Sequence, residues 1–347
     1  MIIPILSISI RRRIIILIIV YMFVFQILFM NKEPEKELVV YGPFHKTFFD
    51  ILRSFRHRHI DCDINLTYYG AHPVTVVDRV KQEVKYGIPT ADVVMLPHYA
   101  TLQLKMEGYL RKYISDQNKS YDSIYKDKDE MWSAIAVEPA HAIYNRSVIK
   151  QELLPTRLEE LANKKLNGKV AMQSVQDWSE GMYSFYYFAE LLKLLGEKKW
   201  DNFVKEFMKN VEPTTFPCYH NMQKYVSRGD FGIGFPLPLI KIGWAVETLN
   251  LTDVPDMASL RSIGIVTKGA HQNAAELFYD YLLSEQWQNK MGKDFEGLIP
   301  TRPGAKMKYN AEFKSGSTMK FFPDERGVRE AFSKETLLEK FKQVGLP

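Results

Sequence analysis

Short apolar runs alternate with amphipathic segments along the first third of the chain. Residues 38–41, 62–68 and 91–96 are predicted as strands, because they are short, rich in apolar residues and bounded by turn signals. Residues 44–55 and 74–86 have apolar side chains at helical spacing, and 99–107 is predicted as a third helix. This alternation predicts a parallel α/β sheet with right-handed crossovers and helices on both faces.

The ends of these three strands hold the first candidate ligand contacts. Ligands of parallel α/β sheets bind beyond the carboxyl ends of the strands. The predicted contacts are Tyr41, Gly42, Pro43, Tyr69, Gly70 and His98.

A second set of elements follows. Residues 131–145 are predicted as two apolar strands flanking Glu138 and Pro139. Thr156 and Glu159 have the capping-box spacing of a helix start. A strand ending at 172 precedes helices at 182–195, 200–210 and 221–227. A strand at 231–235, an apolar helix at 239–249, a segment at 257–266 that crosses back to the first part of the fold and a helix at 273–290 complete the pattern.

The N-terminus has the pattern of an export signal. Three arginines at positions 11–13 precede an apolar run over residues 14–30, and no small-residue cleavage site follows. We therefore predict that residues 1–31 form an uncleaved signal-anchor, a transmembrane helix with its arginines inside. Residues 32–37 are predicted as a linker, and the rest of the chain is expected in the cell envelope, on the periplasmic side of the cytoplasmic membrane.

The last third carries a family resemblance. The glycine-punctuated run 229–235, the segment 262–270, the helical segment 273–288 and the segment 299–303 occur in this order. Together they resemble the bacterial extracellular solute-binding proteins of ABC importers, in particular the branch with ferric-ion, thiamine and phosphonate binders. The resemblance implies a type II periplasmic-binding-protein-like fold, in which two α/β lobes joined by a hinge enclose a ligand cleft.

The resemblance also implies a domain plan and partners. Residues 38–135 would form most of lobe 1 and 136–248 lobe 2, while 249–303 would return to lobe 1 and 304–347 would form a helical tail. The expected function is capture of a small solute and its delivery to an ABC permease, with the receptor as a monomer. A membrane-tethered solute sensor is one alternative, and an ion receptor with unusual metal ligands is another.

Lobe 2 supplies further candidate contacts. The loop 174–181 joins a strand end to a helix start, where unpaired N–H groups and the helix dipole favour an anion. The predicted contacts are Ser174, Gln176, Trp178, Ser179, Tyr219, Phe235 and Pro236. They favour a small organic anion, such as a phosphonate, a sugar phosphate or a carboxylate, although the aromatic residues equally suit an amine or a ring.

The residues do not match the iron site of ferric-binding members. Pro97 and His98 stand where that site has a carboxylate, and Pro236 and Leu237 stand where it has paired tyrosines. Because Fe(III) prefers oxygen ligands, we predict no such site. Three histidines, His45, His72 and His98, are weak candidates for a softer metal, since each follows a strand of one sheet.

Composition and motifs exclude other classes. The formal net charge of +5 includes the three N-terminal arginines, so it does not indicate nucleic-acid binding. The two cysteines, Cys62 and Cys218, are far apart, and a disulfide is not expected. No nucleophile-elbow, P-loop or dinucleotide motif occurs. We therefore predict a binding protein without cofactor or catalytic residues; an enzyme on the same fold is the remaining alternative.

Overall fold

The computed structural model describes residues 34–43, 46–176, 182–238, 245–295, 297–307, 319–332 and 335–346. The predicted signal-anchor lies outside these residues, and no helix within them is long and apolar enough to cross a membrane. The end of the predicted linker is ordered by contacts with the fold. The Glu35 carboxylate accepts hydrogen bonds from the Ala274 N–H (2.9 Å) and the Asn273 amide (3.2 Å).

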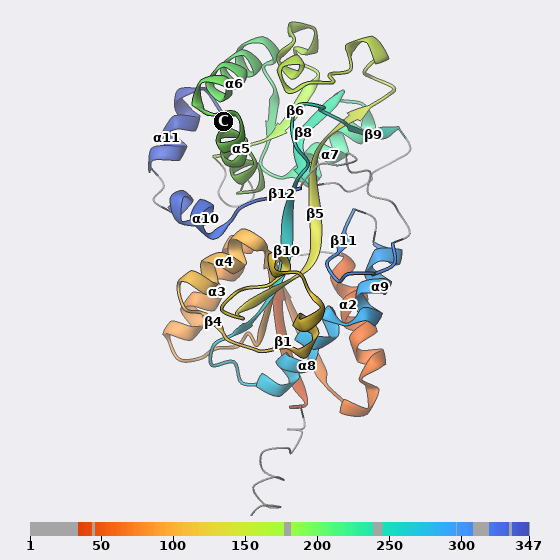
Figure 1. The fold of residues 1–347 in the computed structure, drawn as a ribbon, viewed down its shortest axis with the longest axis vertical. Coiled ribbons are helices and arrows are strands. Elements are labelled where there is room, and N and C mark those ends of the chain that lie inside the picture. The colour runs from red at the N-terminus through yellow and green to blue at the C-terminus, as the bar shows by residue number, and fades with distance from the viewer. Residues whose placement is uncertain are drawn as a thin grey trace, which may run out of the picture.

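The first lobe is the lower half of the molecule in Figure 1. It begins with the strands β1 (Glu37–Gly42), β2 (Asn65–Gly70) and β3 (Val93–Pro97), which alternate with the helices α2 (Lys46–Arg58), α3 (Pro73–Lys85) and α4 (His98–Met106). β1 pairs in parallel with β2 and β3, as the alternating pattern predicts. Because the three strands are parallel, their carboxyl ends lie at the same edge of the sheet. Most apolar side chains of β1 and β3 are buried.

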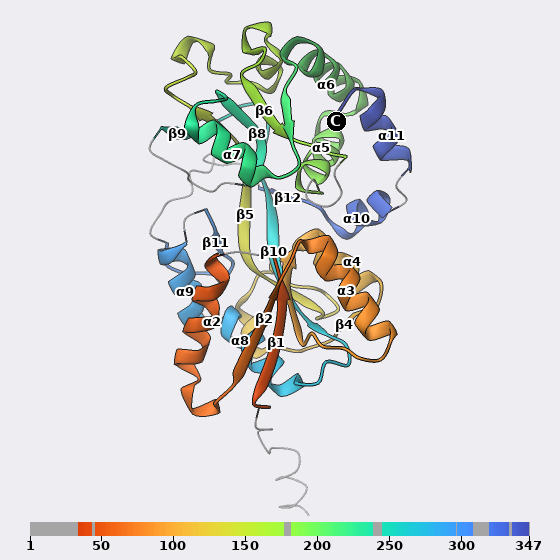
Figure 2. The same ribbon diagram turned by 180° about the vertical axis from the view of Figure 1, so that it is seen from behind.

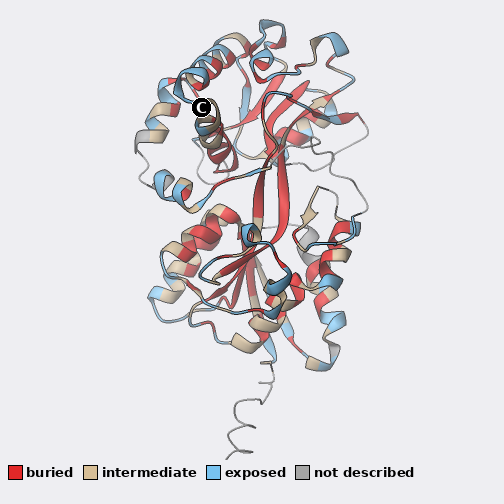
Figure 3. Cartoon of the chain, viewed as in Figure 1, coloured by how far each residue is buried: buried red, intermediate tan, exposed pale blue. Residues whose placement is uncertain are grey.

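Two long strands connect the lobes. β5 (Trp132–Asn145) leads into the second lobe, and β10 (Met257–Val266) returns from it, antiparallel to β5 and to β3. Figure 2 shows both strands running between the two halves, and Figure 3 shows that they are buried. The prediction of two strands around Glu138 and Pro139 was wrong, since one continuous strand contains both. The register between β5 and β10 shifts between Arg261 and Ser262.

The second lobe contains the strands β6 (Val170–Gln173), β7 (Thr214–Phe216), β8 (Ile233–Pro238) and β9 (Val246–Leu249), with the helices α5 (Met182–Leu195), α6 (Glu197–Val211) and α7 (Tyr219–Arg228). The helix predicted over 239–249 was wrong at its end, because β9 is a strand that pairs with β5. Gly232 permits a close approach, because a Cβ atom there would lie 2.4 Å from the Ile149 side chain.

The capping box also differs from its prediction. Glu160, rather than Glu159, accepts hydrogen bonds from the backbone of Thr156 (2.7 Å) and Arg157 (3.3 Å). The turn that follows is a short 3-10 helix over Leu158–Ala162 instead of an α-helix. The shift by one residue follows from the start of this turn, because Arg157 instead of Thr156 is the N-cap.

The chain then returns to the first lobe. Here α8 (Gln272–Leu283) packs beside β10, and α9 (Glu285–Asp294) packs beside β11 (Ile299–Pro300), which pairs with β5. The short strand β4 (Leu110–Arg111) pairs with the end of β10. The single helix predicted over 273–290 is two helices. Ser284 separates them, because its extended backbone ends α8 and its hydroxyl caps α9 by accepting the Trp287 N–H (3.2 Å).

The C-terminal tail spans both lobes. β12 (Lys320–Phe321) pairs with β10, α10 (Glu325–Phe332) lies against α4 and α5, and α11 (Glu335–Gln343) covers the second lobe. Phe341 of α11 stacks on Trp200 with ring centroids 5.3 Å apart. The tail is therefore part of the core of the second lobe.

The strands follow the order β2-β1-β3-β10-β5-β8-β6-β7 across both lobes. The two connecting strands thus lie in the middle of this order. A relative motion of the lobes would bend β5 and β10, and any side chain that they present between the lobes lies at the pivot.

Candidate functional site

A cavity of about 460 Å³ lies between the lobes, within the usual size range of small-molecule sites. The first lobe contributes the residue after β1, the loop after β2 and the start of α4. These are Pro43, residues 70–73, Pro97 and Tyr99. All of them follow carboxyl ends of parallel strands, where the fold rule places ligands.

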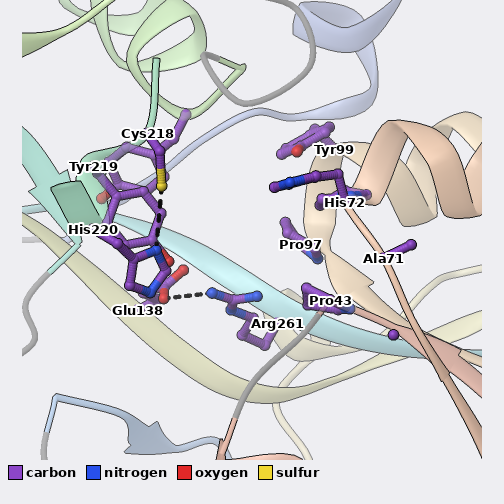
Figure 4. Close-up of a pocket in the computed structure, with 13 residues that line it drawn as sticks. Pro43, Ala71, His72, Pro97, Tyr99, Glu138, Cys218, Tyr219, His220 and Arg261 are labelled. Atoms are coloured by element: carbon purple, nitrogen blue, oxygen red, sulfur yellow. Dashed lines mark hydrogen bonds and ion pairs between the residues drawn. The ribbon is translucent and has the colours of Figure 1, made fainter. Parts of the chain in front are cut away.

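The opposite wall comes from the second lobe, and the floor comes from the connecting strands. The wall consists of Tyr183 on α5 and residues 218–220 at the start of α7. The floor consists of Glu138 on β5 and Arg261 on β10. Figure 4 shows the two walls facing each other across this pair of charged side chains.

Glu138 and Arg261 form an ion pair at the base of the cavity. Arg261 Nη2 donates to Glu138 Oε1 at 2.8 Å, and the side chains are 16% (Arg261) and 4% (Glu138) exposed. The register shift at Arg261 accounts for its position, since such irregularities re-aim side chains near binding sites. Burial opposes the charge, but the Glu138 carboxylate outweighs it and holds the pKa of Arg261 above its usual value.

The guanidinium has donors to spare. It carries five N–H groups; one donates to Glu138, and the Tyr219 hydroxyl is a second hydrogen-bond neighbour. The remaining N–H groups are available to a ligand in the cavity. A guanidinium presents them as a flat fork that matches the two oxygens of a carboxylate or a phosphonate.

Three tyrosine hydroxyls surround this pair. Burial raises the pKa of Tyr99, Tyr183 and Tyr219, Glu138 raises it further, and Arg261 opposes the rise. All three phenols are therefore neutral at physiological pH and can donate hydrogen bonds. The Tyr183 hydroxyl is buried and has no hydrogen-bond partner among the described residues, although its side chain lines the cavity. Leaving such a group unpaired costs about 1–3 kcal/mol, which a ligand would recover.

Cys218 and His220 lie side by side on the second-lobe wall, with Sγ and Nδ1 3.5 Å apart. The His220 ring stacks on Tyr219 at 4.1 Å. Neither Cys218 nor Cys62 forms a disulfide. The described residues contain no group of three or more His, Cys, Asp or Glu side chains placed to hold a metal ion.

Comparison with known families identifies the kind of protein to which this site belongs. Residues 89–326 match the family model described as bacterial extracellular solute-binding protein. The chain belongs to this family. No curated protein sequence matches this solute-binding protein.

Solved structures share its fold. The substrate-binding protein of an ABC transporter from Agrobacterium tumefaciens has a TM-score of 0.76 and 16% identity, over 90% of this chain and 95% of that one. Iron-bound HitA from Pseudomonas aeruginosa has a TM-score of 0.73 and 17% identity, over 90% and 100%. AfuA from Actinobacillus pleuropneumoniae, bound to exogenous fructose-6-phosphate, has a TM-score of 0.73 and 18% identity, also over 90% and 100%. At this identity the likeness establishes the periplasmic-binding-protein fold alone.

Some of the contacts predicted from sequence line the cavity of this solute-binding protein. They are Pro43, Gly70 and Tyr219, together with His72 from the metal candidates. Other predicted residues of the first lobe lie elsewhere. Gly42 pairs with Gly70 inside the sheet. Tyr41 donates to Glu83 (2.7 Å), and Tyr69 packs on Tyr41 with ring centroids 4.9 Å apart.

His98 is buried below the cavity wall instead of lining it. Its Nδ1 lies 2.8 Å from Ser262 Oγ, and its ring meets Trp132 edge-on at 4.4 Å. Burial, followed by the positive charge of Lys105, lowers the pKa of His98 to about 3, so the ring is neutral.

The described part of the predicted anion loop, residues 174–176, lies against neighbouring backbone, including the C-terminal segment. Gln176 donates to the Leu346 carbonyl at 2.6 Å, and Ser174 N–H donates to Phe216 O at 2.8 Å. Neither Ser174 nor Gln176 lines the cavity, and nor do the buried Phe235 and Pro236. His45, Trp178 and Ser179 lie outside the described residues.

Sequence reasoning missed the floor of the site. Glu138 and Arg261 were not among the predicted contacts, nor were Tyr99, Tyr183 and His220. A signal for the floor was present, since each charged residue interrupts an otherwise largely apolar strand. A lone charge in a buried strand needs a partner, and pairing one such charge with the other would have located the floor.

Proposed function

We propose that this substrate-binding component of an ABC importer captures a small organic solute through an oxyanion group, such as a phosphonate, phosphate or carboxylate. The observation that carries the proposal is Arg261, whose spare N–H groups face the cavity beside a neutralising carboxylate. The neutral Tyr183 hydroxyl supplies a further donor. These groups match the acceptor oxygens of an anion.

The electrostatic balance favours a ligand of low charge. Glu138 cancels the formal charge of Arg261, so the floor of the cavity is neutral overall while it still offers directed N–H donors. A bare polyanion would meet little net attraction. A single oxyanion would gain charge-assisted hydrogen bonds, each worth about 1.5–3 kcal/mol when well formed.

The position of the pair links binding to motion. Glu138 and Arg261 lie on the two strands that connect the lobes, and the tyrosines around them come from both lobes. Closure around these strands would bring both walls onto the ligand, which is the usual motion of such receptors. The closed form is the one that we expect to deliver the solute to the permease.

The family places the folded part of the chain outside the cytoplasmic membrane. Tethering through residues 1–31 remains our proposal from the sequence, and so does a monomeric state. Alkaline washing of membranes checks the tether, because an anchored receptor would stay with the lipid while an exported soluble one would be released.

Thermal-shift screening of the full chain in detergent tests the ligand class. A ligand at about 100 times its dissociation constant adds roughly 2.7 kcal/mol of stability. We expect phosphonates, sugar phosphates or carboxylates to raise the melting temperature, and polyamines and divalent metals to leave it unchanged. A response to amines or metals alone would refute the oxyanion proposal.

A paired substitution tests the role of the floor. Arg261→Met together with Glu138→Gln removes both charges without leaving either one unpaired, which buried pairs tolerate better than a single loss. We expect the double variant to fold and to lose anion binding. The matched control is Arg146→Met with Glu247→Gln, an exposed pair between the residue after β5 and the strand β9, which should bind normally.

A further inference from the structure

The first-lobe wall of the cavity is built largely from proline. Pro43 follows β1, Pro73 is the first residue of α3, and Pro97 immediately precedes α4. All three line the cavity. A loop of this kind usually offers backbone N–H groups to an anion at the start of the next helix. Proline has no N–H, so Pro73 and Pro97 remove the donor at the starts of α3 and α4, and Pro43 offers none after β1.

Besides the His72 ring and the Tyr99 hydroxyl, the rest of this wall adds few donors. The Ala71 N–H is occupied by the Gly42 carbonyl at 3.0 Å. Val74 and His98, the next residues of α3 and α4 with an N–H, do not line the cavity. The side chains of Pro43, Ala71, Pro73 and Pro97 present only carbon and hydrogen. A hydroxyl-rich group buried against them would leave its hydroxyls without partners, at a cost in free energy.

Flat rings complete the enclosure. Tyr99 lines the first-lobe wall and is backed by Tyr186 at 5.3 Å. Tyr219 lines the opposite wall and is backed by His220, while Tyr183 lies 6.2 Å from it. Figure 4 shows Tyr99, His72, Pro97 and Pro43 in a row that faces Cys218, Tyr219 and His220. Aromatic and proline faces on both sides fit a flat apolar body between them.

We infer that the solute is an aromatic anion. Its oxyanion would bind Arg261, and its ring would lie between Tyr219 and the first-lobe wall formed by Pro43, Pro73 and Pro97. This inference rests on the proposed function and narrows it. Bare oxyanions, and sugar phosphates with many hydroxyls, are poorer ligands of this cavity.

The space is sufficient for such a ligand. The cavity volume of about 460 Å³ corresponds to on the order of 15 non-hydrogen atoms, if each takes the ~30 Å³ of a liquid water molecule. Phenylphosphonate, with about ten non-hydrogen atoms, leaves room for lobe closure and for a ring substituent.

The test compares ligands that share a head group and differ in the body. Calorimetric titration of the full chain uses phenylphosphonate, methylphosphonate, benzoate, acetate and fructose 6-phosphate. We expect each phenyl compound to bind at least tenfold more tightly than its methyl partner, and phenylphosphonate to bind more tightly than fructose 6-phosphate. The Arg261→Met and Glu138→Gln double variant should lose binding of both phenyl compounds.

The outcomes separate the two proposals. The aromatic inference would be overturned if methylphosphonate or fructose 6-phosphate bound as tightly as phenylphosphonate. If the double variant lost this binding, the oxyanion proposal would still stand. Phenyl binding that persists in the double variant would overturn the oxyanion proposal. An absence of binding by all five compounds would overturn both.

A substitution on the wall provides a second readout. Ala71→Ser adds one hydroxyl to the apolar surface with little change in volume, and Ala305→Ser is a matched control at a half-buried alanine outside the cavity. We expect Ala71→Ser to weaken the binding of phenylphosphonate several-fold and to leave the binding of methylphosphonate unchanged. Equal effects on both ligands would contradict a ring on this wall. Melting temperatures of the free variants confirm that each one folds.

Discussion

Replacement of His98 by asparagine should remove an acid sensitivity that the fold builds into this side chain. His98 is buried, touches Ser262 and Trp132, and has its pKa lowered to about 3 by burial and then by Lys105, with Asp324 opposing. In the unfolded chain its pKa would be about 6.5. The folded state therefore excludes a proton that the unfolded state binds.

The sign and size follow from this difference. The stabilisation is fully present above pH 6.5 and is lost as the pH falls from there towards 3. At pH 5, about 1.5 units below the pKa of the unfolded chain, the free energy of unfolding is lower by about 2 kcal/mol, because each pH unit contributes roughly 1.4 kcal/mol. This is a substantial part of an ordinary folding free energy of about 5–15 kcal/mol.

Urea unfolding at pH 8 and pH 5 measures the effect. His98→Asn keeps a polar group near Ser262 but cannot take up the proton. We expect the unfolding free energy of the wild type to drop by about 2 kcal/mol more than that of the variant between the two pH values. The same substitution at the exposed His57 on α2 provides the control for the exchange of a histidine for an asparagine.

An identical pH dependence in the wild type and in His98→Asn would refute the reasoning. The same variant addresses the sequence-based prediction that His98 contacts ligand. Because the structure places the ring below the wall, we expect the ligand affinity of His98→Asn at pH 8 to remain within about threefold of the wild type, less than one well-made hydrogen bond.

Three further outcomes are expected. Tyr183→Phe should change the stability of the free protein by less than about 1 kcal/mol, because the hydroxyl that it removes has no partner among the described residues. It should weaken binding of the anion about five- to tenfold, and an unchanged affinity would show that the ligand does not reach this hydroxyl. Maleimide modification of Cys218 in a Cys62→Ser background should block ligand binding, because Cys218 lines the cavity. The control is a Cys218→Ser protein treated in the same way. Ligand binding by the fully modified protein would disprove the assignment of this cavity. Lys105→Met should cost about 3 kcal/mol in urea unfolding, because it leaves the buried Asp127 carboxylate without its partner, whereas Glu325→Gln, at a side chain that is 36% exposed, should cost less than about 1 kcal/mol; equal losses would contradict this ranking.

The sequence predicted the regular elements well where local pattern and tertiary context agree. The strands around Val40 and Val93 are apolar because both sheet faces are covered, so their pattern alone identifies them. The prediction failed at β9, whose residues form a strand because they pair with the distant strand β5. It also failed at Ser284, where one capping hydroxyl divides a continuous amphipathic pattern.

The candidate site was predicted only where strand ends sufficed to locate it. Pro43 and Gly70 follow from the rule for parallel sheets, and both line the cavity. The rule does not say which side of a loop faces the ligand, so it also selected Tyr41 and His98, which point into the protein.

Periodicity and near neighbours along the chain were sufficient to predict the alternation of strands and helices, the family and the loops that meet at the sheet edge. The floor of the cavity depends instead on long-range pairing. Glu138 and Arg261 are 123 residues apart, and local pattern cannot show that two distant strands pair in the register that joins them. Long-range pairing and burial make these two side chains a binding element, since an isolated charge in either strand would be too costly to bury.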